Sequence, residues 1–116
     1  MQQGSEVLPF SLQRLIDILN ESVFEAAYDH FISKPALPYV LFSRAASDNF
    51  YADNRVFAKV NRWRLTLCTE LKSTETEKTL ERILDENEIC YEVFDEFFVK
   101  EERLYQVIYE FEEVED

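Results

Sequence analysis

Two stretches of the chain carry apolar residues at helical spacing. The first follows Ser11 and consists of Leu12, Leu15, Ile16 and Leu19. It predicts a helix from Ser11 to Asn20 with Ser11 as the N-cap, because serine accepts a hydrogen bond from the first turn. The second stripe consists of Leu80, Ile83 and Leu84. It predicts a helix from Glu75 to Asn87, with a capping box at Thr74 to Glu77.

Three later segments alternate apolar and polar residues with the period of a strand. In Val56–Leu71 the residues expected to point inward are Trp63, Leu65 and Leu67, and those expected outward are Arg62, Arg64, Thr66 and Cys68. Residues 91–97 and 105–112 flank a charged turn and predict a hairpin. Its aromatic face is expected to hold Tyr91, Val93, Phe97, Tyr105, Val107, Tyr109 and Phe111.

The region between the first helix and residue 56 is less regular. Residues 22–31 are compatible with a short edge strand or with irregular chain, and residues 39–42 predict a buried strand. Residues 43–55 are expected to form a long connection within a hairpin. The only glycine is Gly4, so we expect Asn, Asp, Ser or Pro to make the turns, with Asp48-Asn49 and Asp53-Asn54 as the best positions.

This order of elements predicts an α+β fold, an antiparallel sheet with two helices packed on one face. A chain of 116 residues is expected to form a single domain, 1–116, with residues 1–9 as a flexible end. No apolar run approaches the roughly 20 residues of a membrane span, and the first nine residues do not resemble a signal peptide. Two cysteines in this length favour a reduced, cytosolic protein.

Charge is distributed unevenly along the chain. Residues 1–74 contain 8 acidic and 8 basic residues, whereas residues 75–116 contain 16 acidic and 4 basic ones, so the net charge of −12 arises from the C-terminal part. The stretch from Arg44 to Lys72 has a net charge of +3. The acidic part is either a solvated face or the partner of the basic segment in a neighbouring copy. An acidic surface of this kind disfavours nucleic-acid binding.

The residues that could support catalysis or metal binding do not form a recognisable site. His30 is the only histidine, and Cys68 and Cys90 are too few for a zinc site. The acidic cluster at residues 85–92 lacks the spacing and the glycine of a calcium loop. Trp63 is expected to point inward, away from the basic residues, so no stacking platform for nucleic acid forms. We therefore expect no catalytic residue, no cofactor and no metal, small-molecule or membrane ligand.

A family resemblance is carried by short segments in a characteristic order. They are Leu37-Pro38-Tyr39-Val40, Ser47 to Asn54, Arg64-Leu65-Thr66-Leu67, Leu84 to Ile89 and Tyr105 to Glu110. Over residues 10–112 the chain resembles small head-to-tail joining proteins encoded by prophages and long-tailed phages of Gram-positive bacteria. That family is similar to tail terminators, also called tail-completion proteins. The chain keeps a single lysine, Lys72, where the family usually has a lysine-rich turn.

The resemblance implies a non-catalytic virion-assembly protein that stops tail-tube polymerisation and presents a surface to the filled head. It implies a ring, commonly a hexamer, that contacts other tail or neck proteins in the virion and in the cytoplasm of the bacterial host. Alternatives are another neck component, such as a head-closure or adaptor protein, and an acidic DNA-mimic inhibitor. A ring uses heterologous contacts, for which segregated charge is suited.

The charge pattern then predicts which residues meet between subunits. The basic set is Arg55, Lys59, Arg62 and Arg64, and the acidic set is Glu92, Asp95, Glu96, Glu101 and Glu102. Reversal of Arg62 and Arg64 to glutamate is expected to abolish assembly and to leave the fold intact, because both residues are expected to point outward.

Overall fold

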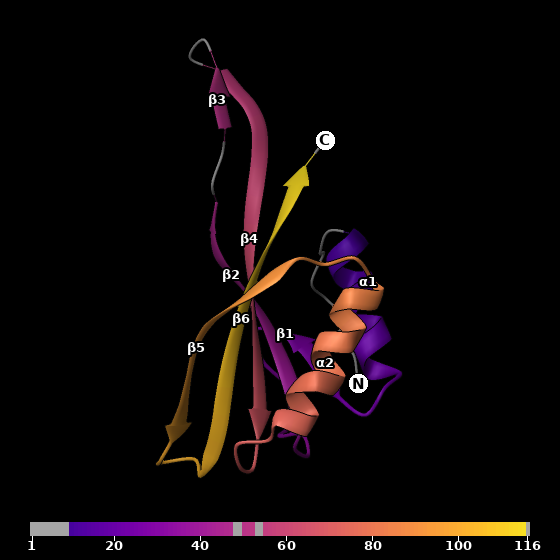
Figure 1. Ribbon diagram of the computed structural model, residues 1–116, viewed down its shortest axis with the longest axis vertical. Helices are drawn as coiled ribbons and strands as arrows, with labels where there is room; N and C mark the ends of the chain where they lie inside the picture. Colours follow the sequence, from indigo (N-terminus) through magenta and orange to yellow (C-terminus); the bar gives the residue numbers. More distant parts are fainter. Residues whose placement is uncertain (1–9, 48–49, 53–54, 116) are drawn as a thin grey trace.

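The computed structural model describes residues 10–47, 50–52 and 55–115 (Figure 1). In chain order the elements are α1 (Phe10–Asn20), β1 (Glu25–Tyr28), β2 (Tyr39–Ser47), β3 (Phe50–Ala52), β4 (Arg55–Thr69), α2 (Thr74–Glu86), β5 (Tyr91–Val99) and β6 (Leu104–Glu115). Both predicted helices and the three predicted C-terminal strands are therefore present.

The described strands form one main sheet in the order β1-β2-β4-β6-β5. Strand β4 lies at its centre and pairs antiparallel with β2 and β6, and β6 pairs antiparallel with β5. The α+β prediction is confirmed. The sheet is not wholly antiparallel, because β1 pairs parallel to β2. Of the two alternatives for residues 22–31, the short edge strand is the one that forms.

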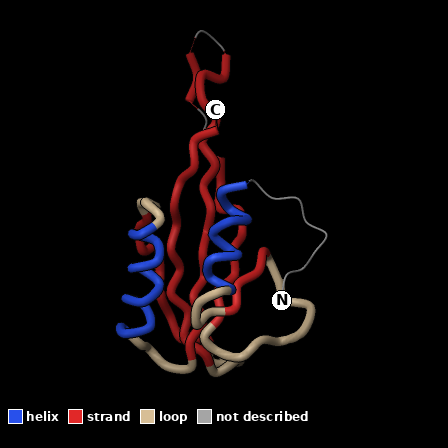
Figure 2. The backbone as a smooth tube through the Cα atoms, turned by 90° about the vertical axis from the view of Figure 1, so that its right-hand side faces the viewer, coloured by secondary structure: helices blue, strands red, loops and turns tan. Residues whose placement is uncertain are grey.

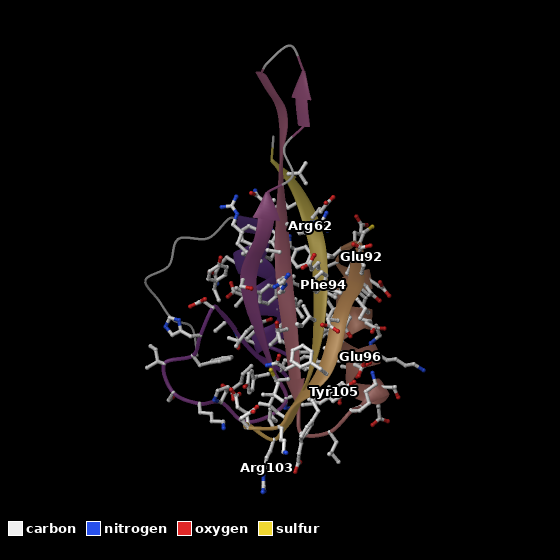
Figure 3. All side chains as sticks on the ribbon, turned by 90° about the vertical axis from the view of Figure 1, so that its left-hand side faces the viewer. Arg62, Glu92, Phe94, Glu96, Arg103 and Tyr105 are labelled. Atoms are coloured by element: carbon white, nitrogen blue, oxygen red, sulfur yellow. The ribbon has the colours of Figure 1, made fainter. Side chains whose placement is uncertain are left out.

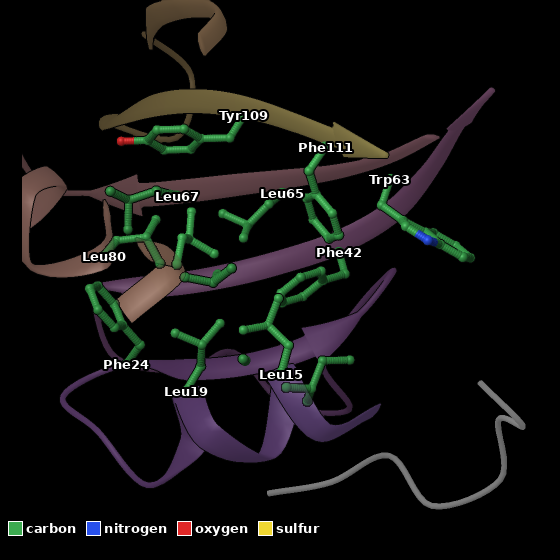
Figure 4. Packing of buried hydrophobic residues seen from close by; sticks show 14 of the residues in the cluster. Leu15, Leu19, Phe24, Phe42, Trp63, Leu65, Leu67, Leu80, Tyr109 and Phe111 are labelled. Atoms are coloured by element: carbon green, nitrogen blue, oxygen red, sulfur yellow. The ribbon is translucent and has the colours of Figure 1, made fainter. Parts of the chain in front are cut away.

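The larger of two apolar clusters joins the helices to the sheet. In Figures 1 and 2 both helices lie on the same side of the strands. The core contains Leu15 and Leu19 from α1, Leu80 and Leu84 from α2, and inward residues of the strands such as Phe42, Leu65, Leu67 and Tyr109 (Figure 4). The predicted inward set of β4 is confirmed, since Trp63, Leu65 and Leu67 are all buried.

The ends of the two helices differ from the prediction at their N-termini. Helix α1 begins at Phe10, so Ser11 lies inside it and is not the N-cap. Helix α2 is capped by Ser73, whose hydroxyl accepts a hydrogen bond from the Thr76 amide, and not by Thr74. Serine one position earlier satisfies the same free amides of the first turn.

The C-terminal end of α2 follows the prediction. Asn87 is the C-cap, and the next residue, Glu88, adopts a left-handed conformation with φ of 59°. The Ile89 amide donates to the Leu84 carbonyl and the Glu88 amide to the Asp85 carbonyl, which is a Schellman motif. Asp29 and Arg103 also have positive φ. Glutamate and arginine at such positions were not predicted, since we expected Asn, Asp, Ser or Pro in the turns.

Residues 43–55 are not the long connection that the sequence suggested. Strand β2 continues to Ser47, and β3 pairs with the beginning of β4, so the region is mostly strand. The turns predicted at residues 48–49 and 53–54 lie outside the described residues, as does the flexible end predicted for residues 1–9. Strand β3 and the first part of β4 form an arm that projects beyond the rest of the sheet (Figure 1). We call residues 50–52 and 55–60 the arm.

The orientation predicted for Phe97 and the exposure expected for Cys68 were wrong. The register of β5 against β6 shifts between Val93 and Asp95, so residues after this bulge change face. Phe97 pairs with Gln106 and therefore does not share a face with Tyr91 and Val93. Cys68 does lie on the outward phase of β4, but it is buried in a second small cluster with Tyr39 and Leu104, against which Phe31 packs.

Candidate interaction surface on strands β4, β5 and β6

The sheet face opposite the helices carries a network of ion pairs. Arg62 of β4 lies opposite Glu112 of β6, and Arg64 lies opposite Glu110. The Arg64 guanidinium donates two hydrogen bonds to Oε2 of Glu110, at 2.6 and 3.1 Å. Arg62 pairs with Glu112 at 2.5 Å and lies 3.6 Å from the other carboxylate oxygen of Glu110. Strands β4 and β6 are thus joined by their charged side chains as well as by their backbones.

Strand β5 is connected to this network through its first residues. Nη1 of Arg62 lies 3.7 Å from a carboxylate oxygen of Glu92, and the Arg64 guanidinium lies 4.8 Å from the ring centre of Phe94 (Figure 3). Glu110 is only 5% exposed, so its charge depends on the two arginines for compensation. The pairing of Arg62 with Glu92 that we predicted between subunits therefore exists within one chain. Whether the same residues also face a neighbouring copy stays a prediction.

A second network ties the other half of β5 to helix α2. Lys72 Nζ lies 2.6 Å from Glu96 Oε1 and 3.0 Å from Glu77 Oε1, and the Tyr105 hydroxyl donates to Glu96 at 2.8 Å. The hydrogen bond from Lys72, followed by that from Tyr105, holds the pKa of Glu96 below its usual value. The hydrogen bonds to Glu96 and, next, to Glu77 raise the pKa of Lys72. The single lysine of this turn thus holds the hairpin to the helix.

The other predicted interface residues are spread over the molecule. Asp95, Glu101 and Glu102 are exposed on β5 and in the turn that follows it. Arg55 begins β4 and pairs with Ala52, while Lys59 pairs with Glu115, so both lie on the arm. In Figure 1 the arm and the β5–β6 turn lie at opposite ends of the long axis. Arg55 therefore cannot meet Glu101 or Glu102 of its own chain.

The apolar surface of β5 is the feature that the sequence did not reveal. Val93, Phe94, Phe97 and Phe98 are between 41% and 59% exposed, although the alternation suggested that Val93 and Phe97 face inward. Strand β5 is nine residues long and is the last strand of the sheet, so one of its backbone edges is unpaired in the described structure. A long apolar edge of this kind is prone to pair with another chain.

The residues considered for catalysis or metal binding have the following surroundings. His30 is exposed, and its Nδ1 lies 3.1 Å from a carboxylate oxygen of Asp29. Cys68 is buried, and burial raises its pKa, which disfavours the reactive thiolate. No group of three or more metal-binding side chains occurs in the part of the chain that the structure describes. Nor is any helix in this part long and apolar enough to cross a membrane.

Two surface hollows lie beside the loop after α2. One of about 370 Å³ lies between Arg14, Ile18 and residues 86–89, and one of about 250 Å³ is lined by Leu12, Trp63 and residues 88–90. The second hollow places Cys90 beside the carboxylates of Glu88, Glu112 and Glu113 in its lining.

The chain matches no protein-family model and no curated protein.

Proposed function

We propose that this protein is a structural component of phage assembly, a tail terminator that forms a ring at the head–tail junction of a long-tailed phage or prophage. The observation that carries the proposal is the free edge of β5, nine residues long with four exposed apolar side chains. An isolated domain gains nothing from such an edge, whereas a subunit of a ring covers it with its neighbour.

Three further features support a ring over an enzyme or an inhibitor. The projecting arm gives the subunit a second, different contact surface, as a heterologous ring requires. The resemblance of residues 10–112 to head-to-tail joining proteins supplies the biological setting. A DNA mimic needs unpaired carboxylates, whereas Glu110 and Glu112 are paired with arginines of β4.

The test is capping of tail tubes. The purified protein is added to tubes polymerised from the major tail protein encoded in the same genome, and the tube ends are viewed by electron microscopy. We expect a ring at one end of each tube and no further elongation when more tube protein is added. A variant with Asp95→Lys and Phe97→Lys, which changes the β5 edge on which the proposal rests, serves as the negative control. Tubes that elongate equally with and without the protein would contradict the proposal.

The runner-up is another neck component, a head-closure or adaptor protein. It has the same need for a covered edge, and it differs in what it binds. Binding to the portal of filled heads without any effect on tail tubes would favour this alternative. A gene position next to those for capsid and major tail proteins is expected for both.

A further inference from the structure

The two open backbone edges of this chain have complementary composition. Beyond Lys59, the first residues of β4 pair only with β3 in the described part of the chain, so the side of residues 55–58 that faces away from β3 is open. Residues 55–60 contain two bases and no acid. Strand β5 has the opposite character, with three acids and no base among its nine residues.

From this juxtaposition we propose that the arm of one copy adds as an extra strand to the edge of β5 in the next copy. The occupant of the β5 edge is thus a second copy of this chain, and the inference rests on the proposed function for its setting only. Main-chain hydrogen bonds give such a strand addition its affinity, and side chains on alternate positions give it specificity. Arg55 and Lys59 are the bases that the arm brings to the strand that carries Glu92 and Asp95.

Charge excludes the simplest competing arrangement, in which β5 pairs with β5 of another copy. That arrangement would bring Glu92, Asp95 and Glu96 against the same residues of the partner, and like charges on adjacent strands are destabilising. The arm has the opposite charge, and its sequence contains the apolar residues Val56, Phe57 and Val60, while β5 exposes Phe94 and Phe97.

The geometry of the chain makes the contact intermolecular and repeating. The arm lies at one end of the long axis, whereas the acidic part of β5 runs toward the other end (Figure 1). Each copy therefore donates one arm and accepts one, which is a heterologous contact that closes into a ring or continues as a chain. The proposal gives the basic residues two different roles. Arg62 and Arg64 compensate the charge of Glu110 within the subunit, and the bases of the arm act between subunits.

The experiment uses two charge-reversed variants of the full chain. The arm variant carries Arg55→Glu and Lys59→Glu, and the edge variant carries Asp95→Lys and Phe97→Lys. Association is measured by analytical ultracentrifugation up to the highest soluble concentration. We expect the wild-type protein to associate. The association should weaken as the salt concentration rises, because salt screens exposed charges over a Debye length of ~8 Å at physiological ionic strength. Each variant alone should associate at least about tenfold more weakly than wild type.

A mixture of the two variants gives the decisive result. Association should return, because the acidic arm of the first variant meets the two lysines introduced into β5 of the second. The unchanged basic arm of the second variant meets the unchanged acidic β5 of the first. The matched controls change the same charges elsewhere, Lys34→Glu with Arg82→Glu and Ile32→Lys with Glu70→Lys, all at exposed positions. They should associate as wild type does. If the edge variant melts below wild type, Asp95→Lys alone replaces it, because that exposed side chain contacts only the Glu96 amide.

Three results would overturn the inference: a monomeric wild type, an arm variant that associates normally, or a mixture that does not recover. Its failure is separable from failure of the proposed function. An arm variant that still caps tail tubes refutes the strand addition and leaves the terminator role in place. Wild-type protein that associates through the arm but leaves tail tubes uncapped refutes the terminator role alone.

Discussion

The two edges of the sheet are finished in different ways. At β1, the side-chain amide of Asn20 donates to the Ala26 carbonyl at 2.9 Å, and its oxygen accepts from the Ala26 amide at 2.9 Å, so one side chain takes the place of a neighbouring strand. Ala26 and Ala27 are fully buried. At β5 no side chain from another element takes this role in the described structure; the Glu96 amide donates to the neighbouring Asp95 carboxylate at 2.8 Å, and four apolar side chains are exposed.

The difference shows that edge protection is selective in this protein. The short β1 is covered by α1 and closed by Asn20, which is a common way to prevent unwanted pairing. The long β5 is instead held firmly from its inner side, by Arg62, Arg64 and Lys72, while its outer edge stays available. An edge that is supported but left open is the arrangement expected of a binding surface.

The largest expected effect is on the covered side of the sheet. Trp63 is 5% exposed and its ring meets the ring of Tyr28 in β1 edge-on, at 6.3 Å between centres. We expect Trp63→Ala to lower the free energy of unfolding by about 3–5 kcal/mol, the cost of a large core truncation. Urea unfolding followed by circular dichroism measures it. A loss below about 1 kcal/mol would show that Trp63 contributes no more than a surface residue.

The next effect concerns the support of β5. Arg64→Glu places a second carboxylate beside the buried Glu110, and we expect a loss of about 2 kcal/mol, less than for a fully buried pair because Arg64 is 35% exposed. This replaces the expectation that reversal of Arg62 and Arg64 leaves the fold intact. Arg64→Glu combined with Glu110→Gln is the control and should recover part of the stability in the same urea assay. No recovery would mean that the charge pairing is unimportant.

Removal of the β1 cap tests the comparison most directly. Asn20→Ala leaves both polar groups of Ala26 without their present partner in a buried position, and we expect a loss of about 1–3 kcal/mol. It should also make the protein more prone to aggregate, because a second edge becomes available. Thermal melting and light scattering measure the two effects. Asn20→Asp, which keeps the acceptor alone, should fall between wild type and alanine.

Alkaline pH should weaken the packing beneath the loop that joins β1 to β2. Burial, and next the neighbouring Cys68, raise the pKa of Tyr39 from 10.0 to about 12. Between these values the unfolded chain has lost the tyrosine proton and the folded chain has kept it, so the free energy of unfolding falls as the pH rises through this range. Urea unfolding at several pH values should show a shallower fall for Tyr39→Phe. An identical slope for the two proteins would contradict the assignment.

The smallest effect on stability is expected at the open edge. Phe97 is 41% exposed, and Phe97→Ser should change the free energy of unfolding of the monomer by no more than about 0.5 kcal/mol. Asn20→Ala is the matched comparison from the other edge. A large loss for Phe97→Ser would mean that β5 is part of the core and would remove the basis for a binding edge.

The elements themselves were determined by the sequence. Local spacing placed both helices, the central strand β4 and the C-terminal hairpin, because period and capping chemistry are properties of neighbouring residues. The inward set of Trp63, Leu65 and Leu67 followed for the same reason. The charge segregation was also visible, although not which charges pair with each other.

Only the tertiary structure decided which of these residues are available to a partner. The bulge after Val93 turned Phe97 to the other face. Cys68 is buried in a cluster with Tyr39 of the neighbouring strand β2, against which Phe31 of the β1–β2 loop packs. The register of β4 against β6 set Arg62 and Arg64 on Glu112 and Glu110, which lie 50 and 46 residues away in sequence. The strand order places β5 at one edge of the sheet, and the packing of α1 places Asn20 beside β1 at the other edge. Pairing over such separations depends on register and topology, which local pattern does not encode.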